Sequence, residues 1–478
     1  MTQSIVIQVG QCGNQIGCRF WDLCLREHSF YNKKGNYDHS ISSFFRNTET
    51  HGDNVVSDVP FEKGSSKIKN LKARAILIDM EEGVVNELIN GYLRDVFDST
   101  NLISDVSGSG NNWAVGNLEY GQTYREEISE SIRRAAEQCD CLQCFFVLHS
   151  MGGGTGSGLG TFVLSLLKEE FPDVYRFVCS VYPSKDDDVI TSPYNSVLAM
   201  HQLTKHADCV LPINNQSLLS MCEKIYQVEN KRTSFKASTN GSVSSGAGTI
   251  GEADKKPFDH MNNIVANLIL NMTSSSRFEG SLNVDLNEFA MNLVPFPKLH
   301  YLVSSMAPLY ISKDLGLPPR RLNHAFNDLF AKGHQLMDAD MRKGLYLASA
   351  IVARGKDVQM SDIRNNITRL KDSLEFVNWN QEGWKTGLCN YPPVGQPYSL
   401  LALSNNTSIK HSFMGLRSHF NKLYTRKAHI HHYEKVSGFD ISMFEESLNS
   451  LDSLVTEYND LEMMSRSQEF SVPMMKVL

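Results

Sequence analysis

Residues 150–160 read SMGGGTGSGLG and lie between two apolar runs, one that ends at His149 and a second, TFVLSLL, at 161–167. A linker would not be flanked in this way. Glycines let consecutive backbone N–H groups turn toward an anion because no Cβ stands in the way, and the start of a helix adds the positive end of its dipole. The stretch therefore predicts a strand, a phosphate-binding loop and a helix in succession.

Two common nucleotide-binding loops do not match this stretch. A P-loop closes on a Lys followed by Ser or Thr, and no such pair is present here. The glycines also miss the spacing of the dinucleotide-binding fold, which disfavours an oxidoreductase that uses NAD.

Other apolar runs place the glycine-rich loop in a sheet. Short β-branched or aromatic runs, interspersed with longer helical patterns, occur at 4–9, 73–79, 144–149, 177–182 and 207–214. Such an alternation is what a parallel sheet covered on both faces requires, so we expect a doubly wound α/β domain over 1–215. Ligands of these folds bind beyond the carboxyl ends of the strands, so the loops that follow the runs matter most.

The rest of the chain predicts two further domains. Residues 229–256 are rich in Ser, Gly, Thr, Asn and Lys and nearly free of large apolar groups, which is typical of a flexible insertion. A core helix at about 259–273 follows, and short strands mixed with helices predict an α+β intermediate domain over 216–404. The pattern over 405–478 is helical almost throughout and predicts a helical hairpin packed on the outside.

The overall composition excludes several function classes. Hydrophobic residues make up 41% of the 478 residues and charged residues 21%, as in an ordinary globular protein. The mild net charge of −7 disfavours a nucleic-acid partner. The start, MTQSIVIQVG, fits neither a signal peptide nor a membrane anchor, so no membrane partner is expected. Ten cysteines in a chain of this length indicate reduced thiols and the cytosol.

Two clusters of metal-ligating side chains stand out, CDCLQC at 139–144 and HIHHY at 429–433. A structural zinc site needs four ligands. For neither cluster does the sequence offer an evident second Cys or His pair that would supply the missing ligands. Buried thiols and an ordinary helix are therefore the preferred interpretations.

The loop GGGTGSG, in its strand–loop–helix setting, resembles the phosphate loop of the tubulin family and of the bacterial tubulin-like division GTPases. The resemblance implies a GTPase domain that binds GTP or GDP together with Mg²⁺. It also implies that the phosphates are contacted by Ser150, Gly152, Gly153, Gly154, Thr155 and Gly156.

Two loops after other strands fit the same resemblance. GQCGNQIG at 10–17 follows the first strand. The residues implied to wrap the phosphates there are Gly10, Gln11, Cys12 and Gln15. In DMEEG, at 79–83, the resemblance implies that Glu81 positions Mg²⁺ on the phosphates with support from Asp79. Carboxylate oxygens are suitable ligands for Mg²⁺. Without the other loops, however, two acids at this spacing would more often belong to an exposed loop.

A third loop, SGSGNNWAVG at 107–116, resembles the family loop that senses the γ-phosphate. The implied donors are Gly110 and Asn111, with Trp113 packed behind them. By itself the loop would be only a turn. Together with the other loops, it implies the contact that distinguishes GTP from GDP.

Asparagines carry the prediction of a guanine base, because an amide offers both a donor and an acceptor to a base edge. Asn215 in PINNQSLL and Asn262 in FDHMNN match the family positions, although a single Asn is more often a turn or cap residue. Asp188 matches the position near the ribose. Two departures occur, since Ser192 replaces an acidic residue and Phe258 replaces the Tyr that stacks on the base; stacking survives the loss of a hydroxyl.

The segment NVDLNEFAMNLVPFPKLHYL, at 283–302, resembles the family segment that reaches a neighbouring subunit's nucleotide across a longitudinal contact. The alpha subunit carries a catalytic Glu here and the beta subunit a Lys; in this chain the residue is Glu288, three after Asp285. We expect both carboxylates on one helical face, where they can orient water at a neighbour's γ-phosphate. GTP hydrolysis would then be completed only on assembly. The alternative is a solvated pair of acids.

Within the family, the chain is most similar to the epsilon-tubulins. The similarity rests on the insertion at 229–256, the loop DDDVITSPYN at 186–195 and an ending, SRSQEFSVPMMKVL, in place of an acidic tail. It implies longitudinal contacts with other tubulin subunits, contacts with centriolar proteins, and a role in centriole or basal body microtubules. The implied location is the cytoplasm, the cytoskeleton and the centrosome. The alternative is a GTP-bound structural adaptor at the centrosome that does not hydrolyse GTP.

Overall fold

The computed structural model of the chain describes residues 2–31, 39–51, 55–59, 61, 68–184, 188–239, 258–278, 280–312 and 315–467. For residues 50, 51, 55, 56 and 231–239 the description covers the backbone only.

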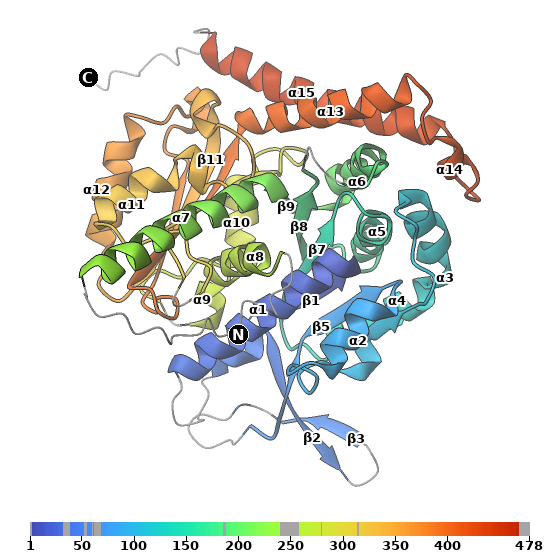
Figure 1. Ribbon diagram of the computed structural model, residues 1–478, viewed down its shortest axis with the longest axis horizontal. Helices are drawn as coiled ribbons and strands as arrows, with labels where there is room; N and C mark the ends of the chain where they lie inside the picture. Colours follow the sequence, from blue (N-terminus) through green and yellow to red (C-terminus); the bar gives the residue numbers. More distant parts are fainter. Residues whose placement is uncertain are drawn as a thin grey trace, which may run out of the picture.

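A six-stranded parallel sheet lies at the centre of the N-terminal half (Figure 1). Its strands, in spatial order, are β6 (Leu102–Ser104), β5 (Ala75–Asp79), β1 (Gln3–Val9), β7 (Leu142–Ser150), β8 (Tyr175–Tyr182) and β9 (Cys209–Asn214). Five of these strands match the apolar runs of the sequence, which confirms the predicted parallel sheet. The sixth, β6, has only three residues and was not predicted.

Helices cover both faces of this sheet, which explains the unbroken apolar runs. Successive strand residues point to opposite faces, so Ile5 and Ile7 enter one core while Val6 enters the other. The first core is closed by α4 (Arg125–Glu137), α5 (Gly160–Glu170) and α6 (Ser192–His206), and the second by α1 (Gly10–Tyr31), α7 (Asn215–Thr239) and α8 (Asp259–Met272).

A small antiparallel sheet, ordered β3-β2-β4, lies at the edge of the domain. Its strands are β2 (Phe45–His51), β3 (Val55–Asp58) and β4 (Asn70–Ala73). The sequence interpretation assigned no structure here. Part of the reason is that β2, FRNTETH, has few apolar residues, so an apolar run does not mark it as a strand.

The second half of the chain contains a mixed four-stranded sheet. Its order is β10 (Leu302–Ala307), β13 (Tyr398–Asn406), β11 (Tyr346–Gly355) and β12 (Trp384–Cys389), with only the β11–β12 pair parallel. The accompanying helices are α9 (Ser274–Arg277), α10 (Leu286–Leu293), α11 (Leu322–Leu329) and α12 (Met360–Lys371). The predicted α+β class is confirmed, although β13 extends past the expected start of the helical part at 405.

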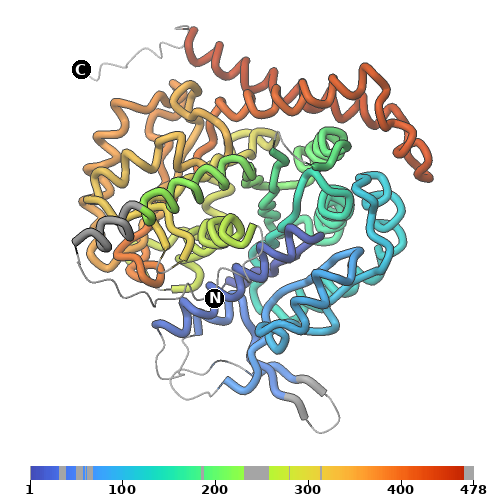
Figure 2. The backbone as a smooth tube through the Cα atoms, viewed as in Figure 1, coloured from blue at the N-terminus to red at the C-terminus, as the bar shows by residue number. Residues whose placement is uncertain are grey.

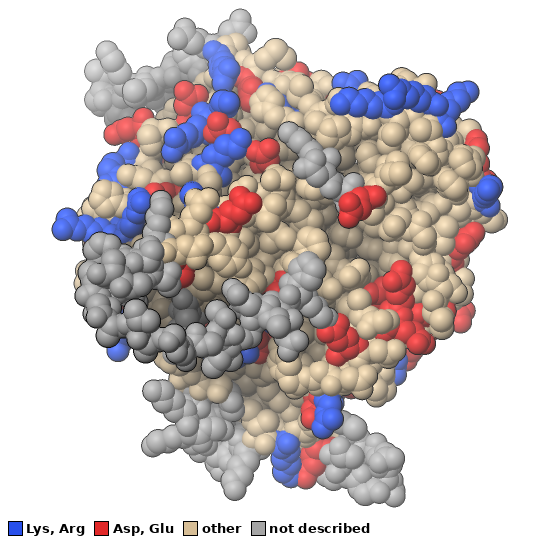
Figure 3. Space-filling model, viewed as in Figure 1, with Lys and Arg blue, Asp and Glu red and all other residues tan. Residues whose placement is uncertain are grey.

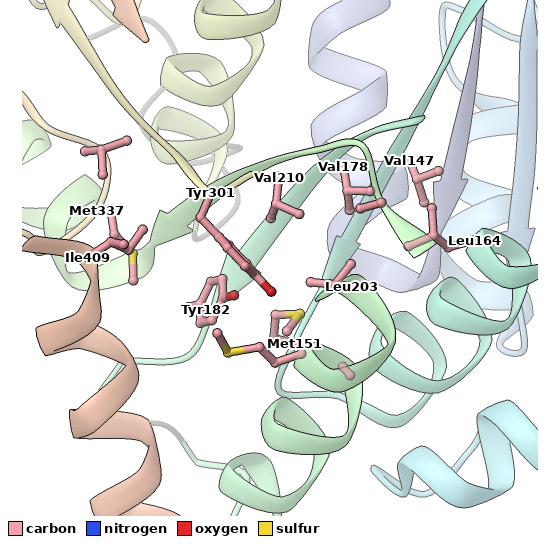
Figure 4. Close-up of a cluster of buried hydrophobic side chains, with 14 of the residues drawn as sticks. Val147, Met151, Leu164, Val178, Tyr182, Leu203, Val210, Tyr301, Met337 and Ile409 are labelled. Atoms are coloured by element: carbon pink, nitrogen blue, oxygen red, sulfur yellow. The ribbon is translucent and has the colours of Figure 1, made fainter. Parts of the chain in front are cut away.

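A continuous core joins the two sheets. Val210 on β9 donates its N–H to the carbonyl of His300 at 2.9 Å, and a bridge pairs Val210 with Tyr301. Around this junction, side chains from both halves pack together, including Tyr182, Met337 and Ile409 (Figure 4). The two sheets are therefore held as one packed unit at this point.

The C-terminal helices lie against α6 on the outside of the molecule (Figure 2). They are α13 (Lys410–Tyr424), α14 (His431–Glu434) and α15 (Ser442–Arg466), so the predicted helical hairpin is confirmed. An aromatic cluster fastens it, because the ring centroid of Tyr194 lies 5.3 Å from that of Phe420 and 5.0 Å from that of Phe444.

The expected insertion at 229–256 is wrong in its first part. Helix α7 continues to Thr239, so the polar composition of 229–239 belongs to a helix rather than to an irregular segment. Lys, Glu, Asn and Ser are tolerated on a helix that needs few apolar positions. The remainder of the insertion, 240–256, lies outside the described residues, as do 185–187 and 468–478. Within the described ranges, no helix is long and apolar enough to cross a membrane.

Candidate nucleotide-binding site

The predicted loops lie at one edge of the parallel sheet. All neighbouring strands of the sheet run in the same direction, so the carboxyl ends of β1, β5, β7, β8 and β9 share that edge. Gly10, Asp79, Ser150, Asp188 and Asn215 lie at or after those strand ends, one for each strand in turn. This is where an open α/β sheet binds its ligands.

The start of α1 touches the glycine-rich loop. Gly10 has a φ of +73°, which a side chain would strain, and a Cβ there would lie 3.0 Å from the N atom of Gly156. A Cβ on Gly156 would in turn lie 2.6 Å from Oγ of Ser150. The two loops thus approach so closely that only glycine fits at both positions.

The helix after the glycine-rich loop begins with an unusually wide turn. Residues Thr155–Leu159 form a π-helical segment that leads into α5, and Thr161 Oγ1 donates to the carbonyl of Ser157 at 2.7 Å. The first N–H groups of a helical segment have no partner within it, and a wide turn spreads them apart. This end of the segment can therefore donate several hydrogen bonds to one anion.

The loop at 107–116 packs on the glycine-rich loop. Ser109 Oγ lies 2.9 Å from Thr155 Oγ1, and a Cβ on Gly154 would lie 2.5 Å from the N atom of Asn112. Gly110 and Asn111 are exposed, with φ values of +56° and +54°. The structure thus brings this predicted pair beside the glycine-rich loop.

Asn195, in the sequence PYN, joins these loops and was given no role from sequence. Its Nδ2 donates to the carbonyls of Asn111 at 2.9 Å and Gly152 at 2.8 Å. Its Oδ1 accepts hydrogen bonds from the N–H of Trp113 at 2.9 Å and from the hydroxyl of Tyr433 at 2.6 Å. All of its amide contacts bridge distant segments, so nothing in the local pattern could have revealed them.

Two carboxylates stand at the end of β5. Asp79 is 3% exposed, and its Oδ2 has no hydrogen-bond partner among the described residues. Burial raises the pKa of the Asp79 carboxyl to about 7, and the negative charge of Glu81 acts in the same direction. Glu81 borders the next loop, since a Cβ on Gly108 would lie 2.8 Å from its Oε1. An unpartnered buried oxygen beside a second carboxylate fits a hard cation such as Mg²⁺.

Helices α1 and α8 carry several of the residues predicted to bind the nucleotide, and they lie side by side. An ion pair of 2.5 Å between Arg19 and Asp259 ties the start of α8 to α1. Cys12, Gln15 and Arg19 are spaced along one face of α1, so Cys12 and Gln15 are directed to the same side as that ion pair. Burial raises the pKa of the Cys12 thiol to about 12, so the thiol stays protonated.

The candidate base-binding residues lie at the starts of α8 and α7. Phe258 is 53% exposed with a φ of +78°, and Asn262 is 7% exposed with no side-chain hydrogen bond to the described part of the chain. At α7, Asn214 Oδ1 accepts from the N–H of Gln216 at 2.8 Å, so Asn214 is the cap and the amide of Asn215 is not used for capping.

Glu288 and Asp285 lie apart from these loops. Asp285 occupies the N-cap position of α10, just outside the helix, and Glu288 lies in the first turn. No hydrogen bond or ion pair between described residues links either carboxylate to the nucleotide loops. Instead, Glu288 forms an ion pair with Lys385 on β12, a partner that sequence analysis missed because it lies almost a hundred positions away.

The fold arranges the two clusters of possible metal ligands differently: the cysteines have separate hydrogen-bond partners, whereas the ring centroids of His431 and His432 lie 4.1 Å apart. Cys139 accepts a hydrogen bond from Arg74 at 3.3 Å, and Cys144 donates to Ser4 Oγ at 3.4 Å. Over the described ranges, no three His, Cys, Asp or Glu side chains come close enough to hold a metal ion by themselves. A Mg²⁺ site at Asp79 and Glu81 would need further oxygens, such as those of phosphates and water.

Comparisons with known proteins agree with this geometry. The family model described as the Tubulin/FtsZ family GTPase domain matches residues 3–223, and the tubulin C-terminal domain matches 297–418. The tubulin epsilon chain of Mus musculus is 60% identical over 478 residues, which cover 100% of both chains. The epsilon chain of Homo sapiens is 61% identical, over 97% of this chain and 96% of the relative. The tubulin beta-1 chain of Chondrus crispus is 34% identical over 96% and 94%.

Proposed function

The chain belongs to the tubulin family and resembles its epsilon chains over its whole length, and we propose that it binds GTP or GDP at the edge of the parallel sheet and joins other tubulin subunits head to tail. The observation that carries the proposal is the mutual contact of the glycine-rich loop with the start of α1 and with the 107–116 loop. At both junctions glycines allow this close approach, because a Cβ on Gly10 or Gly154 would meet atoms of the other loop.

The phosphates are held by backbone donors. N–H groups at Gly10, Gln11 and Cys12 begin α1, and those of Gly154 to Gly156 begin the π-helical turn, so two helix starts point at one region. Gln15 adds a side-chain amide from α1. Gly110 and Asn111, held beside the glycine-rich loop by Asn195, extend this set toward a third phosphate.

We assign the carboxylates of Asp79 and Glu81 to Mg²⁺. When bound with the nucleotide, the ion neutralises phosphate charge. We expect Asp79→Asn and Glu81→Gln each to weaken GTP binding about tenfold or more in the presence of Mg²⁺, because a charged contact is worth about 1.5–3 kcal/mol. The measurement is the thermal shift produced by GTP in Mg²⁺ and in EDTA, and only the Mg²⁺-dependent part of that shift should shrink.

Glu82→Gln, which changes the neighbouring exposed acid, is the matched control. A full Mg²⁺ effect in both site variants would exclude these two residues.

Asn215, Asn262 and Phe258 form the proposed base pocket, with Asp188 near the ribose. We expect Asn262→Ala to lower the preference for GTP over ATP about tenfold or more, because buried amide contacts with the guanine edge are lost. Competition of GTP, ITP and ATP against a fluorescent nucleotide measures that ratio. Asn263→Ala, one residue along the same helix, should leave it unchanged. An unaltered GTP-to-ATP ratio in Asn262→Ala would refute the assignment.

We propose that Glu288, with Asp285, acts on the GTP of a neighbouring subunit across a head-to-tail contact. A carboxylate there orients the attacking water, which is the positioning role that phosphoryl transfer requires. Such a contact is heterologous, so the site is completed only in an assembly and an isolated subunit hydrolyses GTP poorly.

The ion pair of Lys385 with Glu288 holds that carboxylate on its own subunit. We expect Lys385→Met to raise turnover of the partner's GTP by up to about fivefold, because a half-exposed ion pair is worth up to about 1 kcal/mol. Phosphate release in mixed assemblies measures the effect. Lys371→Met, which breaks the comparable pair with Glu382, serves as control. A lower turnover in Lys385→Met would mean that the lysine supports catalysis instead.

The proposed setting is the centriole or basal body, where the protein supports microtubule assembly or stability together with centriolar proteins. The similarity to epsilon chains supports it. The alternative is a structural adaptor at the centrosome that keeps its GTP. Chromatography of the bound nucleotide, after purification and again after mixing with candidate tubulin partners, separates the two. Conversion of GTP to GDP only in the mixture supports the GTPase, and persistent GTP supports the adaptor.

A further inference from the structure

The C-terminal helices carry an uneven distribution of charge. From Lys410 to Tyr433 the sequence contains five Lys or Arg residues and five His residues, with no Asp or Glu. In a chain with a net charge of −7, such a stretch is unusual. It comprises α13 and the turn that leads into α14, and Figure 3 shows Lys and Arg gathered on this part of the surface.

One side of α13 faces solvent. Phe413 and Phe420 are buried against the core, and the opposite side is exposed. A shallow hollow runs along the exposed side. It is lined by Met414, Arg417, Ser418, Asn421, Lys422 and Thr425. The spacing of these residues places them on one helical face, so the hollow follows the helix for most of its length.

The positive charges of α13 are neutralised only in its first half. Lys410 pairs with Glu462 at 2.5 Å, and Arg417 pairs with Asp452 at 2.8 Å, both on α15. Lys422, Arg426 and Lys427 are exposed and form no ion pair with any residue that the structure describes. A cation in the last turn of a helix is stabilised by the negative end of the helix dipole. Three cations within six residues are more than this effect explains.

The turn after α13 is held in a defined shape. Lys427 and His429 adopt left-handed φ values of +49° and +59°, which non-glycine residues rarely do. The hydroxyl of Tyr194 donates to the carbonyl of Ala428 at 2.8 Å, and Asn112 Nδ2 donates to the carbonyl of His432 at 2.9 Å. These contacts fix the direction in which the exposed cations project.

We propose that the basic face binds an acidic peptide segment of a partner protein. The basic face is defined as Lys422, Arg426, Lys427, His431 and His432. Carboxylates of the segment pair with the cations, and an apolar residue of the segment contacts the exposed Met414.

A peptide fits this surface better than a polyanion does. The hollow is lined from Met414 to Thr425, which corresponds to about 17 Å along a helix. Carboxylates of α15 lie beside α13, since Asp452 pairs with Arg417 and the exposed Glu445 lies next to Tyr424. These carboxylates would repel the continuous phosphates of a nucleic acid or the broad surface of an anionic membrane. A short extended segment avoids them.

The test uses the full chain and a fluorescent peptide of ten glutamates with one central leucine. We expect saturable binding that weakens about tenfold or more in the variant Lys422→Glu/Arg426→Glu/Lys427→Glu, because three attractive contacts become repulsive. The matched control, Arg94→Glu/Lys356→Glu/Arg364→Glu, makes the same change of net charge elsewhere and should bind as the unaltered chain does.

Further variants and probes separate the proposed peptide binding from its alternatives. Thermal melting checks that both triple variants are folded, and Lys422→Gln/Arg426→Gln/Lys427→Gln should show an intermediate loss. Met414→Ser should weaken the leucine-containing peptide more than an all-glutamate peptide. Equal loss in the basic-face and control triples would overturn the proposal, as would equally tight binding of a single-stranded RNA or of phosphatidylserine vesicles.

Discussion

Replacing Gly154 by alanine is expected to lower the affinity for GTP by about a hundredfold or more. A Cβ at this position would lie 2.5 Å from the N atom of Asn112, 2.5 Å from Oγ of Ser109 and 2.9 Å from the carbonyl oxygen of Asn112. Two of these three atoms belong to the backbone, so no side-chain rotation relieves the clash. The glycine-rich loop and the 107–116 loop must separate, and their preorganised donors then no longer converge on the phosphates.

The measurement combines the nucleotide retained after purification with a direct titration. Gly83→Ala is the matched control, because a Cβ there would meet nothing within 4 Å and the residue lies in α2 (Glu82–Asn90). That change should stabilise the helix by up to about 1 kcal/mol and leave GTP binding unchanged. If folded Gly154→Ala protein binds GTP as tightly as the unaltered chain, the close junction of the two loops does not form the phosphate site.

Glu288→Ala is expected to lower hydrolysis of the partner's GTP in a mixed assembly by about a hundredfold to ten-thousandfold, the usual contribution of a positioned general base. The change removes the only acid within α10. The chain's own GTP should bind as before, because Glu288 contacts none of the described nucleotide loops. Single-turnover phosphate release, with labelled GTP loaded on the partner only, measures the effect.

Glu382→Ala is the control for this experiment, since Glu382 is an exposed acid with a single lysine partner elsewhere on the surface. Sedimentation must show that the Glu288→Ala assembly still forms, so that lost turnover is separated from lost contact. Undiminished turnover in an intact assembly would remove Glu288 from the mechanism and favour the adaptor.

Much of the fold follows from patterns that a few neighbouring residues create. Buried strands such as β7 and β8 appear as unbroken apolar runs, and the glycines between β7 and α5 indicate an anion loop before any contact is known. Short or polar elements could not be predicted from such local patterns. β6 has three residues, and β2 has polar or charged side chains at every position after Phe45, so neither carries enough apolar sequence to be recognised.

The candidate site was predicted to a similar extent. The positions of Gly10, Gly154 and Asp79 at strand ends followed from the sequence and from the family resemblance. The amide network of Asn195, the ion pair of Lys385 with Glu288, and the capping role of Asn214 rather than Asn215 did not. The first two depend on residues distant in the chain. The third depends on which of two identical side chains the backbone turns toward the helix start.

The sequence by itself determined the parallel sheet, the chemistry of its loops and the family, because hydrophobic periodicity and glycine conformation are properties of residues close together along the chain. Only the tertiary structure decided which loops touch, which carboxyl oxygen of Asp79 stays unpartnered, and how the turn after α13 is anchored to Asn112. That last hydrogen bond joins residues 320 positions apart. Such contacts arise when the whole core closes, because burial brings together polar groups that no local pattern relates.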